Sequence, residues 1–139
     1  HLEHRRQRQM CIRDSDKLEI MRADNLSIFS GNVSAIEGNL EIRSNKIIIT
    51  SSNDVKTIKK IDAIDDVKIF KDDLYIEGNK AKYDIILDTL IVFGNVKVQQ
   101  NDNIVFCDEI VVDLKKSSSI MKSDATNRVE ALIVSKDDS

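Results

Sequence analysis

The sequence predicts an all-β protein, and three observations support this fold class. Segments of four to nine residues, such as LEIR (40–43) and DVKIF (66–70), alternate apolar with polar side chains. Gly, Asn, Asp or Ser separates one segment from the next, and no stretch carries the apolar stripe of an amphipathic helix over three turns. This pattern is typical of half-buried antiparallel strands, so we expect about a dozen or more of them in a sandwich or barrel.

A longer repeat relates these segments to one another. Residues 31–50 (GNVSAIEGNLEIRSNKIIIT) align without gaps on residues 65–84 and on residues 94–113. Self-similarity over 20–50 residues is typical of architectures that stack one supersecondary unit. Each unit must be covered by its neighbours, because it cannot bury its own apolar face.

The alternation places one set of apolar side chains on a single face of the sheet. The residues that we expect to line the interior are Ile20, Ile28, Val33, Leu40, Ile42, Ile47, Ile49, Val67, Ile69, Leu74, Ile76, Tyr83, Val92, Val96, Val98, Val105, Ile110 and Val112. Ala35, Ala81 and Leu90 share this side, whereas Ser27, Glu41 and Lys82 are expected to face water.

Four Gly-Asn pairs, at 31–32, 38–39, 78–79 and 94–95, are expected to form tight turns. Glycine and asparagine supply the positive φ angles that such turns need. A nucleotide-binding loop would instead require a strand followed by a helix, and this sequence contains no helical pattern.

The first fifteen residues differ from the rest of the chain. The stretch RRQRQMCIRDS (5–15) has four arginines and no strand alternation. Back-translated, it resembles the transposon adapter used in preparing sequencing libraries, and we interpret residues 1–15 as a disordered artefact rather than a nucleic-acid-binding arm or a targeting peptide. We then expect residues 16–139 to be a single domain that is truncated at its N-terminus, so that the true N-terminus and any secretion signal are missing from this sequence.

Composition and residue placement argue against an enzyme. Both histidines, His1 and His4, lie in the leader, which excludes a serine triad and a His-based metal site. The aspartates gather in predicted turns, and of the two cysteines Cys107 is expected to be a buried, inert thiol. Aromatic residues make up 4% of the chain and the net charge is −3, which disfavours nucleic-acid binding. We therefore predict no catalytic residues, no metal site and no cofactor.

An ordered series of motifs carries a family resemblance. SIFSGNVSAIEGNLEIRSNKIII (27–49), GNKAKYDIILDTLIVFGNVKVQQNDNIVFCDEIVVDL (78–114) and RVEALIV (128–134) resemble the OstA-like family of periplasmic lipopolysaccharide-transport proteins. The resemblance implies a β-jellyroll, a V-shaped antiparallel sheet whose apolar groove shelters the acyl chains of lipid A. In that case the interior residues named above would be the ligand-binding residues.

The resemblance also implies partners and a location. The protein would act in the periplasm as a head-to-tail homo-oligomer between a membrane-anchored member and an outer-membrane member of the transport system. Sheet edges carry unpaired backbone groups that can pair with another chain. Our candidate for this interface is the terminal strand formed by Arg128, Val129, Glu130, Ala131, Leu132, Ile133 and Val134.

Two alternatives remain open on the sequence. The chain could be a structural β-repeat module with a filled interior, or it could be the membrane-anchored homologue of the same transport system. A filled core would be rich in Phe, Leu and Met, whereas the predicted interior is mostly Ile and Val with one Tyr. This composition favours a groove, although β-branched residues are preferred in strands in any case.

Overall fold

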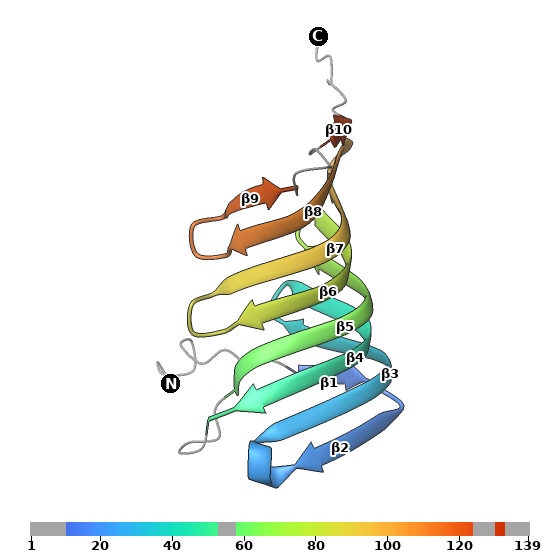
Figure 1. The fold of residues 1–139 in the computed structure, drawn as a ribbon, viewed down its shortest axis with the longest axis vertical. Helices are drawn as coiled ribbons and strands as arrows, with labels where there is room; N and C mark the ends of the chain where they lie inside the picture. The colour runs from blue at the N-terminus through green and yellow to red at the C-terminus, as the bar shows by residue number, and fades with distance from the viewer. Residues whose placement is uncertain (1–10, 53–57, 124–129, 133–139) are drawn as a thin grey trace.

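The structure is a computed structural model that describes residues 11–52, 58–123 and 130–132, and these form one antiparallel sheet (Figure 1). Its strands are β1 (Cys11–Asp14), β2 (Lys17–Met21), β3 (Leu26–Glu37), β4 (Leu40–Ser51), β5 (Ile58–Lys71), β6 (Leu74–Asp84), β7 (Thr89–Gln100), β8 (Asn103–Asp113), β9 (Ser118–Lys122) and β10 (Glu130–Leu132). Among the described residues, a 3-10 turn at Arg22–Asp24 is the one helical element, and no helix is long and apolar enough to cross a bilayer. The all-β prediction is confirmed.

The six long strands follow one another in the sheet in the order of the chain. Strands β3 to β8 pair with their sequence neighbours, and they stack along the long axis of the molecule (Figure 1). At one edge β1 and β2 both pair with β3, and at the other edge β9 and β10 both pair with β8. Each edge of the sheet is therefore made of two short strands placed end to end.

Each long strand contains two of the short segments expected from the sequence. In β3, for example, LSIF and NVSAI form one strand of 12 residues. The pairs Gly31-Asn32, Asp65-Asp66 and Gly94-Asn95 have positive φ angles, and the register shifts beside each of them. These are β-bulges, which bend a strand without ending it. The prediction of tight turns at 31–32, 78–79 and 94–95 is thus wrong, because these pairs lie inside β3, β6 and β7.

The bulges fall at one level of the sheet and form a crease that divides it into two arms. Arm A contains the segment of each long strand that lies on the β2 and β9 side of the crease, such as 26–30 of β3 and 80–84 of β6. Arm B contains the segment on the β1 and β10 side, such as 33–37 of β3 and 74–77 of β6. The strands curve at the crease, so that the two arms face each other in a V (Figure 1).

The free ends of the arms are two rows of turns. Arm B ends in two-residue turns at 38–39, 72–73 and 101–102, and arm A ends in longer turns that include 85–88 and 114–117. The Gly38-Asn39 pair is therefore the one Gly-Asn pair, of the four predicted, that forms a hairpin turn.

Part of the leader belongs to the sheet. Cys11–Asp14 form β1, and Ile12 pairs with Ala35 and packs against the core. The expectation that residues 1–15 are disordered is therefore wrong for this segment, since an apolar side chain opposite a buried alanine stabilises an edge strand. Residues 1–10 lie outside the described part of the chain.

The crease depends on a residue without a side chain at Gly94. Its φ is +88°, and a Cβ placed there would lie 2.6 Å from Nδ2 of Asn79 on the neighbouring strand. We expect Gly94→Ala to lower the free energy of unfolding by about 3 kcal/mol, because it adds this overlap to a strained backbone. Urea denaturation measures the loss.

Gly38→Ala is the matched control for this substitution. Gly38 also has a positive φ, of +60°, but a Cβ there would meet nothing within 4 Å. The control should lose only the backbone strain, about 1 kcal/mol. Equal losses at the two positions would contradict a close approach at the crease.

Candidate functional site

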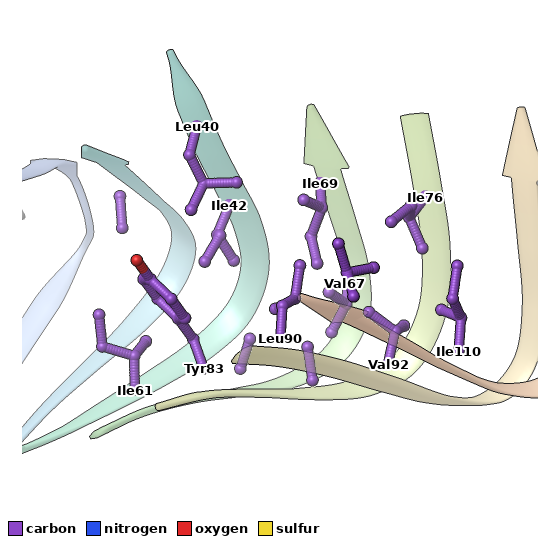
Figure 2. Packing of buried hydrophobic residues seen from close by; sticks show 14 of the residues in the cluster. Leu40, Ile42, Ile61, Val67, Ile69, Ile76, Tyr83, Leu90, Val92 and Ile110 are labelled. Carbon is purple, nitrogen blue, oxygen red and sulfur yellow. The ribbon is translucent and has the colours of Figure 1, made fainter. Parts of the chain in front are cut away.

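The space between the arms is filled by apolar side chains from both of them. The buried residues, each 0–7% exposed, are Val33, Ala35, Leu40, Ile42, Ile47, Ile49, Ile61, Ala63, Val67, Ile69, Ile76, Ala81, Tyr83, Leu90, Val92, Val96, Val98, Cys107, Ile110 and Val112. Figure 2 shows Leu40, Ile42 and Ile69 of arm B directed toward residues of arm A that include Tyr83 and Leu90. The arms thus close on each other, and a molecule could enter the interior only if they separated.

Most of the predicted interior residues lie in this cluster. The residues found buried are Val33, Leu40, Ile42, Ile47, Ile49, Val67, Ile69, Ile76, Tyr83, Val92, Val96, Val98, Ile110 and Val112. Leu74 and Val105 are half-buried and pack against the cluster. The structure brings these residues together on one face, as the alternation predicts.

Ile28 lies on the opposite face from the one predicted. It pairs with Ile48, which sits between the buried residues Ile47 and Ile49, whereas its neighbour Phe29 packs against the core. The physical reason is the bulge at 31–32. Because β3 continues through this bulge, the alternation that places Val33 on the inner face also places Phe29 there, and Ile28 points outward.

Ile20 is on the inner face but is not covered. It pairs with Ser27 and is 58% exposed, and Leu18, which pairs with Phe29, is 49% exposed. At this edge of arm A the apolar inner face therefore remains open to solvent.

Two members of the core, Ile61 and Ala63, are not predicted by the alternation as we applied it. Both lie on β5 before the crease and are almost completely buried. The sequence does carry a signal for them. The 29-residue spacing of the repeat relates Ile61 to Leu90 and Ala63 to Val92, which face inward. Extending the repeat backwards from residue 65 would have found them.

The two rows of turns enclose a polar opening, which we call the mouth. At the end of arm B the inward positions include Glu37, Lys71 and Gln100, which share the register of Leu40 and Leu74. A cavity of about 230 Å³ lies between the 72–73 turn and the 114–117 turn, and one of about 210 Å³ lies between the 38–39 turn and Asp88. The apolar interior is therefore bordered by charged and amide groups where it meets water.

A buried polar cluster joins the arms at the mouth. The hydroxyl of Tyr83 on arm A donates a hydrogen bond to Glu37 Oε1 on arm B at 2.8 Å, and it lies 3.1 Å from Oδ1 of Asp88 in the 85–88 turn. Burial raises the pKa of Tyr83, and the neighbouring carboxylates of Glu37 and Asp88 raise it further. The phenol therefore stays protonated and acts as a donor.

The outer face of arm B is polar and carries paired charges. Arg43 contacts Glu41 at 2.7 Å and stacks 5.5 Å from the centre of the Phe70 ring. The hydrogen bond from Arg43 lowers the pKa of Glu41. Such exposed pairs add little stability, but they make this surface polar, in contrast to the inner face.

Carboxylates and thiols are the potential metal ligands in the described part of the chain. No group of three or more His, Cys, Asp or Glu residues there is arranged to hold a metal ion. The buried carboxylate of Asp88 is hydrogen-bonded to Tyr83.

Comparison with known proteins identifies the family. The family model described as "LptA/(LptD N-terminal domain) LPS transport protein" matches residues 14–118. The chain belongs to this family. It is 24% identical to the lipopolysaccharide export system protein LptA of Escherichia coli K12, over 87% of this chain and 69% of that protein, and LptA of Shigella flexneri matches to the same extent.

A solved structure shows the same fold as this member of the LptA/LptD N-terminal family. LptH of Pseudomonas aeruginosa, described as the LptA-homologous periplasmic component of the lipopolysaccharide transport device, superposes with a TM-score of 0.80. The match has 12% sequence identity and covers 91% of this chain and 96% of LptH. The predicted β-jellyroll is confirmed.

The predicted edge interface is only partly described. Glu130–Leu132 form β10, which pairs with Ile104–Phe106 and is the outermost strand of arm B at the β8 edge. Arg128, Val129, Ile133 and Val134 lie outside the described residues. The position of β10 agrees with a sheet edge, and its pairing with a second chain stays a prediction.

The core also contains a thiol, as expected for Cys107. It is 7% exposed, and burial raises its pKa, whereas Cys11 is exposed. Because the thiolate is the reactive form, we expect a maleimide to label Cys11 rapidly at neutral pH and Cys107 only after unfolding. Mass spectrometry of labelled peptides, with and without urea, measures both rates. Equal rates in the native protein would contradict a closed interior.

Proposed function

We propose that this protein binds lipopolysaccharide in the periplasm and carries it from the inner toward the outer membrane, with the acyl chains of lipid A between its two arms. One observation carries the proposal: a single apolar face runs from β2 to β8 and remains exposed at Leu18 and Ile20 of β2. Membership of a lipopolysaccharide transport family supports the choice of ligand, and the periplasmic location of LptH supports the compartment.

The chemistry of this face suits a carrier. Burying apolar surface is favourable by about 25 cal/mol per Å² and has no directional requirement. Acyl chains between the arms would be held strongly, yet they could slide along the face without breaking specific bonds. The inner face is mostly Ile, Val and Ala, so separated arms would present a smooth apolar surface.

The sheet edges supply a way to join subunits. The β1 and β2 edge and the β9 and β10 edge lie at opposite ends of the stack (Figure 1). Pairing one with the other by strand addition would extend the inner face from copy to copy. The same pairing would connect a head-to-tail oligomer to the membrane-anchored and outer-membrane members of the system.

A structural repeat module is the second candidate, and the closed interior favours it. Twenty buried apolar side chains among the described residues already fill the space between the arms, as they would in a module that only polymerises. The two functions differ in one measurable property, since only a carrier brings lipid into contact with the inner face.

Photo-crosslinking tests this contact. We expect a photoreactive amino acid at Ile42, Ile76 or Val112 to capture lipopolysaccharide, because these side chains point into the interior. Probes at Glu41 and Lys82 are the controls, since both lie on the outer face. Covalent adducts are detected by gel shift. Equal labelling of both sets, or labelling of neither, would reject the carrier.

The edge interface has a separate test. We expect deletion of residues 128–134 to abolish concentration-dependent oligomers, because it removes β10 from the edge of β8. Sedimentation velocity over a range of protein concentrations measures the change, and a deletion of 135–139 is the control. Oligomers that persist without 128–134 would place the interface elsewhere.

A further inference from the structure

The hydrogen bond between Tyr83 and Glu37 crosses the mouth of the V. Tyr83 belongs to arm A and Glu37 to arm B, and 46 positions of sequence separate them. Figure 2 shows the hydroxyl of Tyr83 directed away from its own strand, toward the layer that contains Leu40. The bond at 2.8 Å therefore ties together the two arms whose separation would admit a lipid.

An amphiphile held between the arms would meet this hydrogen bond at the mouth. A headgroup of sugars and phosphates cannot enter an apolar interior without a large desolvation cost. A lipid whose acyl chains lie between the arms must therefore keep its headgroup outside, and the two parts must be connected through the mouth. A molecule that slides along the inner face past Tyr83 meets the bond at this connection.

Asp88 provides the hydroxyl with a second acceptor on its own arm. Asp88 lies in the turn that follows the strand of Tyr83, and its Oδ1 is 3.1 Å from the hydroxyl. One hydroxyl proton serves one acceptor at a time. If the arms separate, Tyr83 can keep a hydrogen bond to Asp88 while it loses Glu37, so no buried donor is left unpaired.

We propose that Tyr83 and Glu37 form a gate across the mouth, an inference that rests on the proposed function. The gate opens for each lipopolysaccharide molecule as the hydroxyl of Tyr83 transfers its hydrogen bond from Glu37 to Asp88. The gate defines a lateral route for the headgroup along the rows of turns. It also assigns a role to a buried polar cluster that an apolar acyl-chain site does not need.

The first test measures the opening without lipid. Asp73 and Ser117 are exposed, line the same cavity of about 230 Å³ and belong to opposite arms. In a Cys11→Ser, Cys107→Ala background, spin labels attached after Asp73→Cys and Ser117→Cys report the distance across the mouth. We expect Tyr83→Phe and Glu37→Ala to raise the separated population about tenfold, the effect of losing a hydrogen bond to a charged group. Glu37→Gln keeps an acceptor but loses its charge, so its distribution should lie between those of the parent and Glu37→Ala.

The second test measures loading. We expect lipopolysaccharide to associate about tenfold faster with Tyr83→Phe and with Glu37→Ala than with the parent, because the competent state is more populated. Tyr75→Phe is the matched control: its hydroxyl also donates to a carboxylate, Glu77, but on the outer face. It should load at the parent rate. A variant that merely failed to fold would load more slowly than the parent, so faster loading cannot be explained by a loss of folding.

The outcomes separate the gate from the function. A parent protein that binds lipopolysaccharide, with Tyr83→Phe loading no faster and showing unchanged spin-label distances, would overturn the gate and leave the carrier intact. A parent that does not bind lipopolysaccharide rejects the carrier, and the gate falls with it. Should Tyr83→Phe fail to fold, Glu37→Ala decides the question from the other arm.

Discussion

The whole architecture depends on a crease that six consecutive strands share. A strand bent at any other level would place its outer half out of register with both neighbours, since backbone hydrogen bonds join every pair from β3 to β8. The bulge residues at 31–32, 65–66 and 94–95 meet this constraint by taking positive φ angles at equivalent points of the repeat. Two of these pairs are Gly-Asn and one is Asp-Asp, which indicates that the backbone conformation, rather than one residue type, is required.

The crease turns one face of the sheet toward itself, and the interior follows from that geometry. Side chains that alternate along each strand meet their counterparts on the other arm, so Val33 and Leu40 are buried together with Tyr83 and Leu90. The first edge remains uncovered, and apolar residues such as Ile20 are exposed there on the inner side. Both a lipid carrier and a structural repeat module could have a closed centre and an open edge. Only a direct test of ligand binding therefore distinguishes the two functions.

Two kinds of force act between the arms. Burial of apolar side chains is strong in total but has no preferred geometry, so it allows the arms to slide and reseal. The hydrogen bond from Tyr83 to Glu37 has a defined length and direction, and it acts at one point of the mouth. In the proposed gate, a non-directional interior combined with a directional contact at its border would let the arms open at a specific place while the core keeps its register.

The sequence by itself determined the fold class, the repeat and most of the inner face, because period-2 alternation is a local property that each strand displays without its neighbours. It also indicated the family through an ordered series of motifs, and the match over residues 14–118 agrees. Only the tertiary structure decided that Gly31-Asn32 and Gly94-Asn95 bend strands instead of ending them, since a positive φ serves a turn and a bulge equally well. The same ambiguity is the reason why the predicted face of Ile28 was wrong, since its direction depends on whether the strand continues through residues 31–32. The contact of Tyr83 with Glu37 likewise arises only when the arms fold together, because no local pattern links residues that lie 46 positions apart.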